Sequence, residues 1–188
     1  MRKAYHGVIP PFITPVDAKE RVDEEGFRAL LEDGINRGLH GIFVAGTNGE
    51  CMALTQAERN RAIRISVDQA AGRVPVLAGV MDSSTTRVIE NIKALEGVGI
   101  RCAVVTSIFY ARHSSQEETV RHFERIGRET DMDLIVYNMP SMTGLTLSPA
   151  TVLRLSKLER VVGYKDSSPA YAGFMQVLAQ LRDTPFAC

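Results

Sequence analysis

Short runs of apolar, largely β-branched residues recur along the chain, and each run is followed by a longer segment with helical periodicity. The runs are Val8–Phe12, Gly41–Ala45, Val74–Ala78, Cys102–Thr106, Leu134–Tyr137 and Val161–Lys165. From the second run onward their starts lie about 27 to 33 residues apart, which is the length of one strand-helix unit. Continuous apolar runs of this kind indicate parallel strands that are buried on both faces.

The segments between the runs carry residues that begin and end helices. Starts are predicted at Asp23, at the capping boxes Thr55–Glu58 and Ser115–Glu118, and at Ser148-Pro149 and Ser168-Pro169. Ends are predicted at Gly38, at Gly72, and at Gly97 or Gly99. The helix expected over residues 116–130 has a charged face that indicates exposure to solvent. Strands and helices therefore alternate along the whole chain.

Alternation of this kind fits either a doubly wound parallel sheet or a (β/α)₈ barrel. A Gly-x-Gly-x-x-Gly turn after the first run would favour the doubly wound sheet, but Thr14–Ala18 follows it instead. No linker or low-complexity segment divides the sequence. We therefore expect α/β architecture of the (β/α)₈ TIM-barrel type, with residues 1–188 forming a single domain.

Length qualifies this expectation, because a complete barrel takes about 250 residues and this chain has 188. We expect about six strand-helix units of a barrel whose carboxyl-terminal part is missing, with Pro185–Cys188 opening the seventh strand. The first and sixth strands would then have open edges. For this reason we also expect the chain alone to be unstable and poorly active.

Composition excludes several functional classes. The 22 Lys and Arg residues balance 22 Asp and Glu residues, and no basic run is longer than Arg2-Lys3, so we expect no binding to nucleic acid or to anionic membranes. No apolar stretch approaches the roughly 18 residues of a membrane span. Met1–Tyr5 is not followed by the apolar region of a signal peptide. A cytoplasmic location is predicted.

The cysteines and histidines give no sign of a metal centre. The three cysteines, Cys51, Cys102 and Cys188, are widely spaced, which predicts neither a disulfide framework nor a Cys-x-x-Cys site. We expect Cys51 to serve in packing. The four histidines lack metal-ligand spacing, so surface positions are expected for them. They are His6, His40, His113 and His122.

Polar residues stand where three of the predicted strands end, which is where a parallel barrel holds its chemistry. Lys165 ends the sixth run. It could simply extend its ammonium group to solvent. In a barrel mouth, however, burial disfavours the ammonium form, and a neutral amine can attack a carbonyl to form a Schiff base.

Two further strand ends could serve the same cavity. Tyr137 ends the fifth run, where its hydroxyl could transfer protons, or it could be a core tyrosine with a satisfied hydroxyl. Gly46-Thr47-Asn48-Gly49 follows the second run and offers backbone and side-chain donors to an anion such as a carboxylate. It lacks the Gly-Lys-Ser/Thr ending of a P-loop.

At these three strand ends the sequence closely resembles the dihydrodipicolinate synthase / N-acetylneuraminate lyase family of Schiff-base-forming pyruvate aldolases and their dehydratase relatives. Residues 46–50 resemble the family's Gly-Ser/Thr-Thr-Gly-Glu loop. Residues 137–144 resemble its Tyr-Asn-x-Pro-x-x-Thr/Ser-Gly motif, and residues 163–166 resemble Gly-Ile-Lys-Asp/Glu. The resemblance spans the whole chain.

The resemblance implies a role for each matching residue. Lys165 would form the Schiff base with pyruvate or another 2-oxo acid, and Tyr137 would transfer protons. Thr47 would hydrogen-bond the tyrosine, while Asn48 and the backbone of Gly46 and Gly49 would hold the substrate carboxylate. A covalent iminium makes an electron sink, so no metal and no dissociable cofactor is expected.

Departures from the family pattern bear on the substrate. Met142 stands where dihydrodipicolinate synthases have an arginine that holds the second substrate's carboxylate, and methionine cannot form that ion pair. We therefore expect a lyase or dehydratase for a 2-oxo-3-deoxy sugar acid, with dihydrodipicolinate synthesis as the alternative. Asn48 replaces the second hydroxyl residue of the loop. Tyr110 is assigned to the tyrosine that many members donate to a neighbouring subunit.

The resemblance also implies a homo-oligomer, dimer or tetramer, for the full-length protein. The opposing hypothesis is a barrel without catalysis, either a degenerate relative or a fragment that only associates with partners. The joint presence of Thr47, Tyr137 and Lys165 favours the enzyme.

Overall fold

The computed structural model describes residues 5–188. Met1–Ala4 lie outside the described residues. They include the Arg2-Lys3 pair and most of the Met1–Tyr5 segment considered above for a signal peptide. The described chain forms two compact units. The amino-terminal unit comprises Tyr5–Gly79 and Ala94–Cys102, and the carboxyl-terminal unit comprises Val80–Lys93 and Ala103–Cys188. Across residues 5–188 no helix is long and apolar enough to cross a membrane. A single domain over 1–188 stays a prediction.

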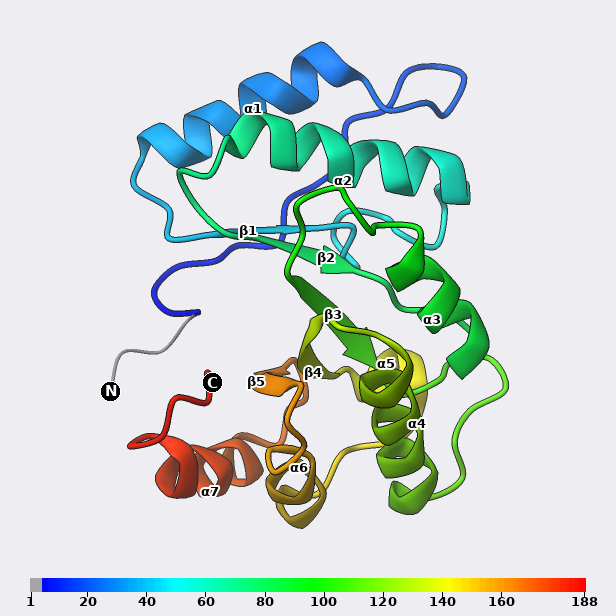
Figure 1. Cartoon of the computed structure of the whole chain (residues 1–188), viewed down its shortest axis with the longest axis vertical. Coiled ribbons are helices and arrows are strands. Elements are labelled where there is room, and N and C mark those ends of the chain that lie inside the picture. The colour runs from blue at the N-terminus through cyan, green and yellow to red at the C-terminus, as the bar shows by residue number, and fades with distance from the viewer. Residues whose placement is uncertain (1–4) are drawn as a thin grey trace. The chain divides into compact units, whose positions relative to one another are not determined.

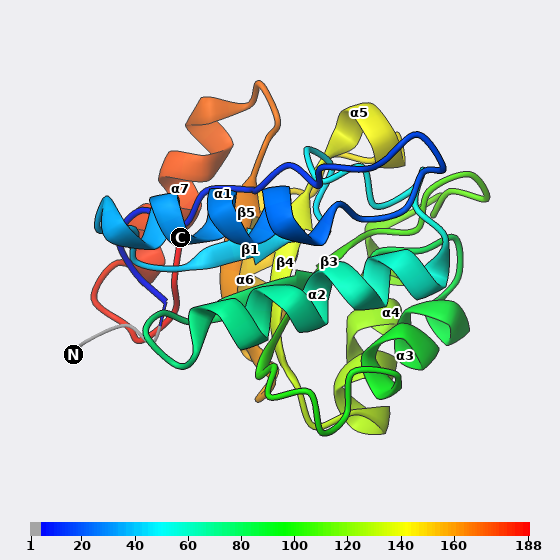
Figure 2. The ribbon, with the colours of Figure 1, turned by 90° about the horizontal axis from the view of Figure 1, so that it is seen from above.

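The amino-terminal unit contains two strand-helix pairs. Its elements are α1 (Glu24–Asn36), β1 (Ile42–Val44), α2 (Gln56–Ala70) and β2 (Val76–Gly79). The two strands are parallel, with Phe43 opposite Leu77. Helices α1 and α2 lie side by side (Figures 1 and 2), and an ion pair from Arg73 to Glu32 joins the segments. Every residue of β1 is buried, as expected for a strand covered on both faces.

Both helices of this unit begin where the sequence predicts. The Asp23 side chain accepts a hydrogen bond from the Gly26 amide, and Thr55 accepts one from the Glu58 amide at 3.3 Å. The second half of the capping box is absent, because the Glu58 carboxylate instead accepts a hydrogen bond from the Val22 amide at 2.6 Å. Glu58 thus fixes the chain that leads into α1.

The expected strand over Val8–Phe12 is wrong as a regular strand. Only Pro11 forms a bridge, parallel to Phe43. Pro10 and Pro11 have no N–H group, so the run cannot donate along a full ladder. The Phe12 amide donates to the Phe43 carbonyl at 2.9 Å, and the Phe43 and His40 amides donate to the carbonyls of Pro10 and Val8.

The carboxyl-terminal unit continues the alternation of strands and helices. Its elements are α3 (Thr85–Lys93), β3 (Cys102–Thr106, of which Cys102 belongs to the other unit), α4 (Gln116–Glu129), β4 (Asp133–Asn138), α5 (Pro140–Thr143), α6 (Pro149–Leu155), β5 (Val161–Asp166) and α7 (Tyr171–Leu181). Helix pairs α3–α4, α4–α6 and α6–α7 are in contact, and Figure 2 shows α3 beside α4. Within each unit the strand order follows the chain, which is the order of a barrel and not the reversed order of a doubly wound sheet.

Strands β4 and β5 are parallel, and their register contains an irregularity that decides which side chains share a face. Leu134 is opposite Val161, but Ile135 is opposite Gly163, so β5 has one extra residue at Val162. From that point to the carboxyl ends, Tyr137 is the partner of Lys165. Paired residues of parallel strands project to the same face, and the bulge therefore aligns these two side chains.

Two expectations for this unit are wrong. Helix α7 begins at Tyr171, not directly after Ser168, because the Ser168 amide donates to the Asp166 carboxylate at 2.6 Å and the Ser168 hydroxyl accepts from Ala170. His122, expected at the surface, is 2% exposed. It lies on the buried face of α4 together with Thr119 and Phe123. A hydrogen bond of 2.9 Å joins its Nδ1 to the Thr85 hydroxyl.

The chain after α7, where Pro185–Cys188 were expected to open a further strand, contributes a single bridge at Ala187 and no regular strand. Ala187 forms a parallel bridge with Gly163. Its amide donates to the Val162 carbonyl at 2.9 Å, and its carbonyl accepts from the Tyr164 amide at 2.8 Å. One edge of β5 is therefore paired with β4 and the other with Ala187.

Candidate active site

Lys165 and Tyr137 lie together at the carboxyl ends of β5 and β4. The Lys165 Nζ is 3.7 Å from the centroid of the Tyr137 ring. The tyrosine is buried, whereas the lysine is half-buried at the strand end. A cation over an aromatic face is attracted by the ring quadrupole, so this contact holds the amine beside the phenol.

A chain of hydrogen bonds connects the same two residues. The Lys165 ammonium donates to the Ser167 Oγ at 3.0 Å, and that hydroxyl donates to the Tyr137 hydroxyl at 3.3 Å. The Tyr137 hydroxyl donates in turn to the Met139 Sδ. A thioether is a weak acceptor, so a substrate oxygen could readily replace it. Amine and phenol are thus joined through one intervening hydroxyl.

On the opposite face of β5, Tyr164 and Asp166 form a second polar network with Asn138. The Tyr164 hydroxyl donates to Asp166 Oδ2 at 2.5 Å, and the Asn138 amide donates to Tyr164 at 3.2 Å. Burial alone would raise the pKa of Asp166, but hydrogen bonds from Tyr164, Ser168 and Asn138 hold that pKa below its usual value. Burial and the neighbouring carboxylate raise the pKa of Tyr164. Asp166 is therefore ionised and the tyrosine neutral at pH 7.

This network positions the backbone on both sides of Lys165. Asn138 Oδ1 accepts a hydrogen bond from the Leu147 amide at 3.1 Å, and the Asn138 carbonyl accepts from the Ser167 amide at 2.9 Å. Asn138, at the end of β4, thus connects the segment after α5 through its side chain and the segment after β5 through its backbone carbonyl.

Met142 lies in the single turn of α5 and is 44% exposed. Gly144 ends the turn with φ 70°, in the left-handed region. A Cβ on Gly144 would lie 2.6 Å from Nη1 of Arg112, so the guanidinium covers this glycine. The loop after β3 therefore brings a cation to the turn in which Met142 replaces the arginine of the family's synthases.

Tyr110 stands in the loop after β3 and is 93% exposed, with a positive φ of 67°. A tyrosine in this backbone conformation is uncommon. Its ring therefore lies on the surface of the carboxyl-terminal unit and not in its core. The role of Tyr110 as an intersubunit residue stays a prediction.

The Gly46–Glu50 loop belongs to the amino-terminal unit and follows β1. It is a tight turn in which the Glu50 amide donates to the Thr47 carbonyl at 3.1 Å and the Thr14 hydroxyl donates to the Gly49 carbonyl at 2.9 Å. Gly46 and Gly49 are buried, Thr47 is half-buried and Asn48 is exposed. That this loop meets Lys165 stays a prediction.

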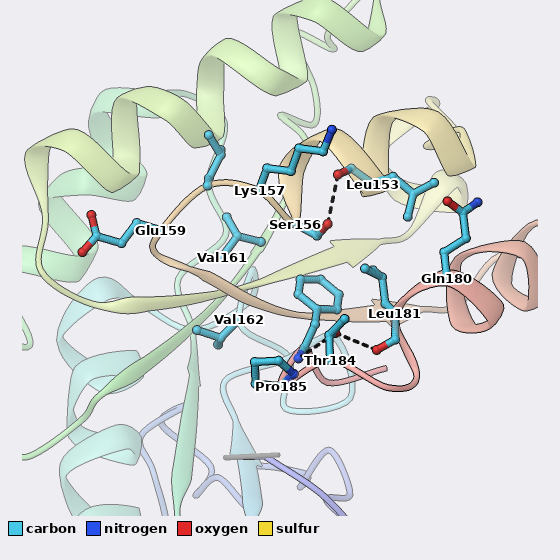
Figure 3. Close-up of a pocket in the computed structure, with 12 residues that line it drawn as sticks. Leu153, Ser156, Lys157, Glu159, Val161, Val162, Gln180, Leu181, Thr184 and Pro185 are labelled. Carbon is cyan, nitrogen blue, oxygen red and sulfur yellow. Dashed lines mark hydrogen bonds between the residues drawn. The ribbon is translucent and has the colours of Figure 1, made fainter. Parts of the chain in front are cut away.

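An open groove of about 680 Å³ lies at the opposite end of β5 from Lys165. Figure 3 shows Val161 and Val162, the first residues of β5, on its wall between Ser156 on one side and Thr184 on the other. At about 3.3 Å per residue, the strand separates Val161 from Lys165 by roughly 13 Å. The chemistry-bearing residues of β4 and β5 are therefore not in this groove.

Within residues 5–188, no group of three or more His, Cys, Asp or Glu side chains is arranged to hold a metal ion. Ser167, Arg112 and the Tyr164–Asp166 pair are functional candidates that the sequence pattern does not predict. Ser167 could have been found from its hydroxyl two residues after the lysine. Arg112 has no such signal, because its approach to Gly144 depends on the path of the loop after β3.

The alternation of strands and helices, with strand order following the chain within each unit, indicates an α/β protein of the barrel class. Lys165 and Tyr137 lie on the same face of neighbouring parallel strands at their carboxyl ends, an arrangement suited to amine and proton-transfer chemistry. The chain belongs to the dihydrodipicolinate synthetase family, whose family model matches residues 4–185.

Relatives with curated names agree with this assignment. The chain is 39% identical over 164 residues to the 4-hydroxy-tetrahydrodipicolinate synthase of Phenylobacterium zucineum, covering 87% of this chain and 55% of that one. It is 37% identical over 163 residues to an uncharacterized DapA-like lyase of Halobacterium salinarum, covering 87% and 53%. The chain thus spans little more than half the length of these relatives.

Solved structures have the same fold. A dihydrodipicolinate synthase from Bacillus anthracis matches with a TM-score of 0.90 and 30% identity, over 96% of this chain and 62% of that one. YagE from Escherichia coli K12, a family member in complex with pyruvate, matches with a TM-score of 0.89 and 29% identity, over 95% and 60%. These likenesses confirm the expected fold class.

Proposed function

We propose that the chain carries the Schiff-base centre of a pyruvate-dependent lyase or synthase, with Lys165 as the nucleophile. The observation that carries the proposal is the placement of Lys165 Nζ 3.7 Å from the Tyr137 ring, with a hydroxyl chain from the amine to the phenol. Structural kinship to a family member in complex with pyruvate supports the substrate. No metal or dissociable cofactor is part of the proposed chemistry.

In the proposed reaction the neutral amine of Lys165 attacks the carbonyl carbon of the 2-oxo acid, and loss of water yields an iminium. The iminium withdraws electrons from the neighbouring carbon, which then loses a proton or a carbon substituent to give an enamine. Tyr137 transfers protons to and from the carbinolamine and a substrate hydroxyl. Thr47 would hydrogen-bond the tyrosine, and Asn48 with the Gly46 and Gly49 backbone would hold the carboxylate.

For the second substrate, the comparisons support the synthase reaction better than the sugar-acid reaction favoured from sequence. Relatives at 35% to 39% identity are named 4-hydroxy-tetrahydrodipicolinate synthase. We therefore propose that the enamine adds to aspartate semialdehyde. The objection from Met142 is weakened, because Arg112 brings a guanidinium over Gly144 in the same turn. An arginine can form a bidentate pair with a carboxylate such as that of aspartate semialdehyde, which methionine cannot do.

A lyase or dehydratase for a 2-oxo-3-deoxy sugar acid remains the second candidate. Met142 favours it, because this half-exposed side chain offers no charge at the position where family synthases have arginine. A homo-oligomer, to which Tyr110 would contribute, and a cytoplasmic location complete the proposal.

The decisive test is borohydride trapping with pyruvate, followed by peptide mass mapping. The adduct is expected on Lys165 and should disappear in Lys165→Arg. Lys157→Arg is the matched control, since Lys157 is an exposed lysine at the groove of Figure 3. A well-folded protein without an adduct on Lys165 would overturn the Schiff-base proposal.

Turnover assays then distinguish the two candidates for the second substrate. Pyruvate with aspartate semialdehyde should give product if the synthase reaction is correct. Cleavage or dehydration of 2-oxo-3-deoxy sugar acids or N-acetylneuraminate, without turnover of aspartate semialdehyde, would establish the second candidate instead.

A further inference from the structure

We infer that Ser167 is a catalytic proton relay between Lys165 and Tyr137 during formation of the Schiff base. The inference rests on the proposed function and names a residue for which neither the family motifs nor the sequence reasoning gave a role. Its basis is a directed chain of hydrogen bonds: Lys165 donates to Ser167 at 3.0 Å, and Ser167 donates to Tyr137 at 3.3 Å.

The placement of Ser167 suits a relay. Its amide donates to the Asn138 carbonyl at 2.9 Å, which anchors the residue to the end of β4. Ser167 is exposed at the strand end, so solvent and small solutes can reach its hydroxyl. The adjacent Ser168 differs, because its hydroxyl accepts a hydrogen bond from the Ala170 amide and serves the turn before α7.

Formation of the carbinolamine requires a proton transfer, because attack by the neutral amine gives an adduct with separated charges. The new bond joins Nζ to the carbonyl carbon, the C=O π bond breaks, and the adduct has a positive nitrogen and a negative oxygen. One proton must move from nitrogen to oxygen to give the neutral carbinolamine. Ser167 takes that proton from Nζ and passes its own to Tyr137, while Tyr137 gives its proton to the adduct oxygen.

Each hydroxyl receives one proton and gives one, so both end unchanged and no external acid or base is consumed. The weak Met139 thioether marks the direction in which the phenol proton points before substrate arrives. In the reacting complex the adduct oxygen would replace that sulfur as the acceptor. Relayed proton transfer of this kind contributes about 10²-fold or more to a rate.

The test measures the rate of iminium formation separately from its final extent. Rapid mixing of the full chain with pyruvate, quenching with borohydride at set times, and mass analysis of the Lys165 peptide give both quantities. We expect Ser167→Ala to slow the rate about 10²-fold and to leave the final extent unchanged. Ser167→Thr keeps the hydroxyl and should stay close to wild type, as should the control Ser168→Ala.

A second readout separates a relay from a merely structural contact. If Ser167→Ala has lost an internal proton carrier, its rate should rise with the concentration of a small buffer such as imidazole, whereas the wild-type rate should not. An Ala variant with the wild-type rate, or a slow Ala variant without buffer dependence, would overturn the relay. An absent adduct in well-folded wild-type protein would refute the proposed function itself, so the two failures are distinguishable.

Discussion

Tyr137 and Lys165 are register partners on neighbouring parallel strands, and the lysine Nζ lies 3.7 Å from the centre of the tyrosine ring. Both residues end runs of buried strand, so the backbone restricts where the amine and the phenol can go. A covalent adduct on the amine must therefore form beside the phenol. If Lys165 forms the proposed adduct, the catalytic task of the tyrosine hydroxyl is separable from the packing of its ring.

Tyr137→Phe separates these two contributions. The ring stays buried, so the melting temperature should change little, whereas kcat should fall about 10²- to 10⁴-fold because the proton-transfer group is lost. Steady-state assays with thermal melts check both statements. Tyr171→Phe is the control, since Tyr171 is 71% exposed on α7 and its hydroxyl has no role in the proposed chemistry. Unchanged kcat in Tyr137→Phe would exclude Tyr137 as the proton-transfer residue.

Tyr164→Phe tests the network behind Lys165. Loss of the hydroxyl removes a donor to Asp166 and should raise the pKa of that carboxyl toward its ordinary value. Because the pKa of Asp166 is lowered in the folded state, its stabilising contribution is present above the unfolded value of about 3.9 and is lost as pH falls through the folded value. We expect Tyr164→Phe to lower the unfolding free energy by about 1–2 kcal/mol at pH 7.

Chemical denaturation of wild type and Tyr164→Phe at pH 7 and at pH 3 checks this prediction. The difference between the two proteins should narrow at the lower pH, where Asp166 begins to take up a proton in the variant before it does so in the wild type. A difference of the same size at both pH values would contradict a contribution through the Asp166 charge.

Arg112→Gln tests whether the guanidinium over Gly144 serves the second substrate. If it holds the carboxylate of aspartate semialdehyde, KM for that substrate should rise at least about tenfold, as expected for a lost charge-assisted pair. The trapping of pyruvate on Lys165 should be unaffected. Arg128→Gln, at an exposed position near the end of α4, is the control. Equal KM values for Arg112→Gln and wild type would remove Arg112 from substrate binding.

His122→Asn tests a buried titratable group behind the loop that carries Tyr110. Burial, reinforced by the neighbouring His113, lowers the pKa of His122 to about 3. The unfolded chain binds a proton at this residue below a pH of about 6.5, whereas the folded chain does not, so folding stability falls as pH drops through this range. Asparagine offers Thr85 a similar acceptor but does not titrate.

Stability of His122→Asn should therefore depend less on pH between 6.5 and 4 than that of the wild type. Denaturant midpoints across this range measure the effect. His6→Asn provides the control, since His6 is exposed. Parallel pH curves for His122→Asn and wild type would show that His122 does not titrate with folding.

Periodicity predicted the elements well where local signals and burial agree. The run Cys102–Thr106 coincides with β3, and the helix expected over residues 116–130 is α4 (Gln116–Glu129). Asp23 and Ser148 are N-caps as expected. These features depend on residues that are close in sequence, so the sequence contains the necessary information.

The register of β4 and β5 and the partners of buried polar groups could not be predicted from the sequence, because they depend on contacts between distant segments. Counted from the starts of their strands without an extra residue, Tyr137 would pair with Tyr164; the bulge at Val162 pairs it with Lys165 instead. The polar partner of the buried His122 is likewise distant, because Thr85 lies 37 residues away. Single-residue shifts of this kind leave no trace in hydrophobic periodicity.

The close contact between Gly163 and Ala187 determines how the chain after α7 lies along the edge of β5. A Cβ at Gly163 would lie 3.2 Å from both the Cβ and the carbonyl oxygen of Ala187, so any larger residue would push Ala187 away by a few tenths of an ångström. Two backbone hydrogen bonds then set the direction of any strand laid along this edge and the parity of its side chains. A larger residue at position 163 would therefore strain the two hydrogen bonds that hold Ala187 against β5, and the inward and outward faces of the segment would be less firmly set.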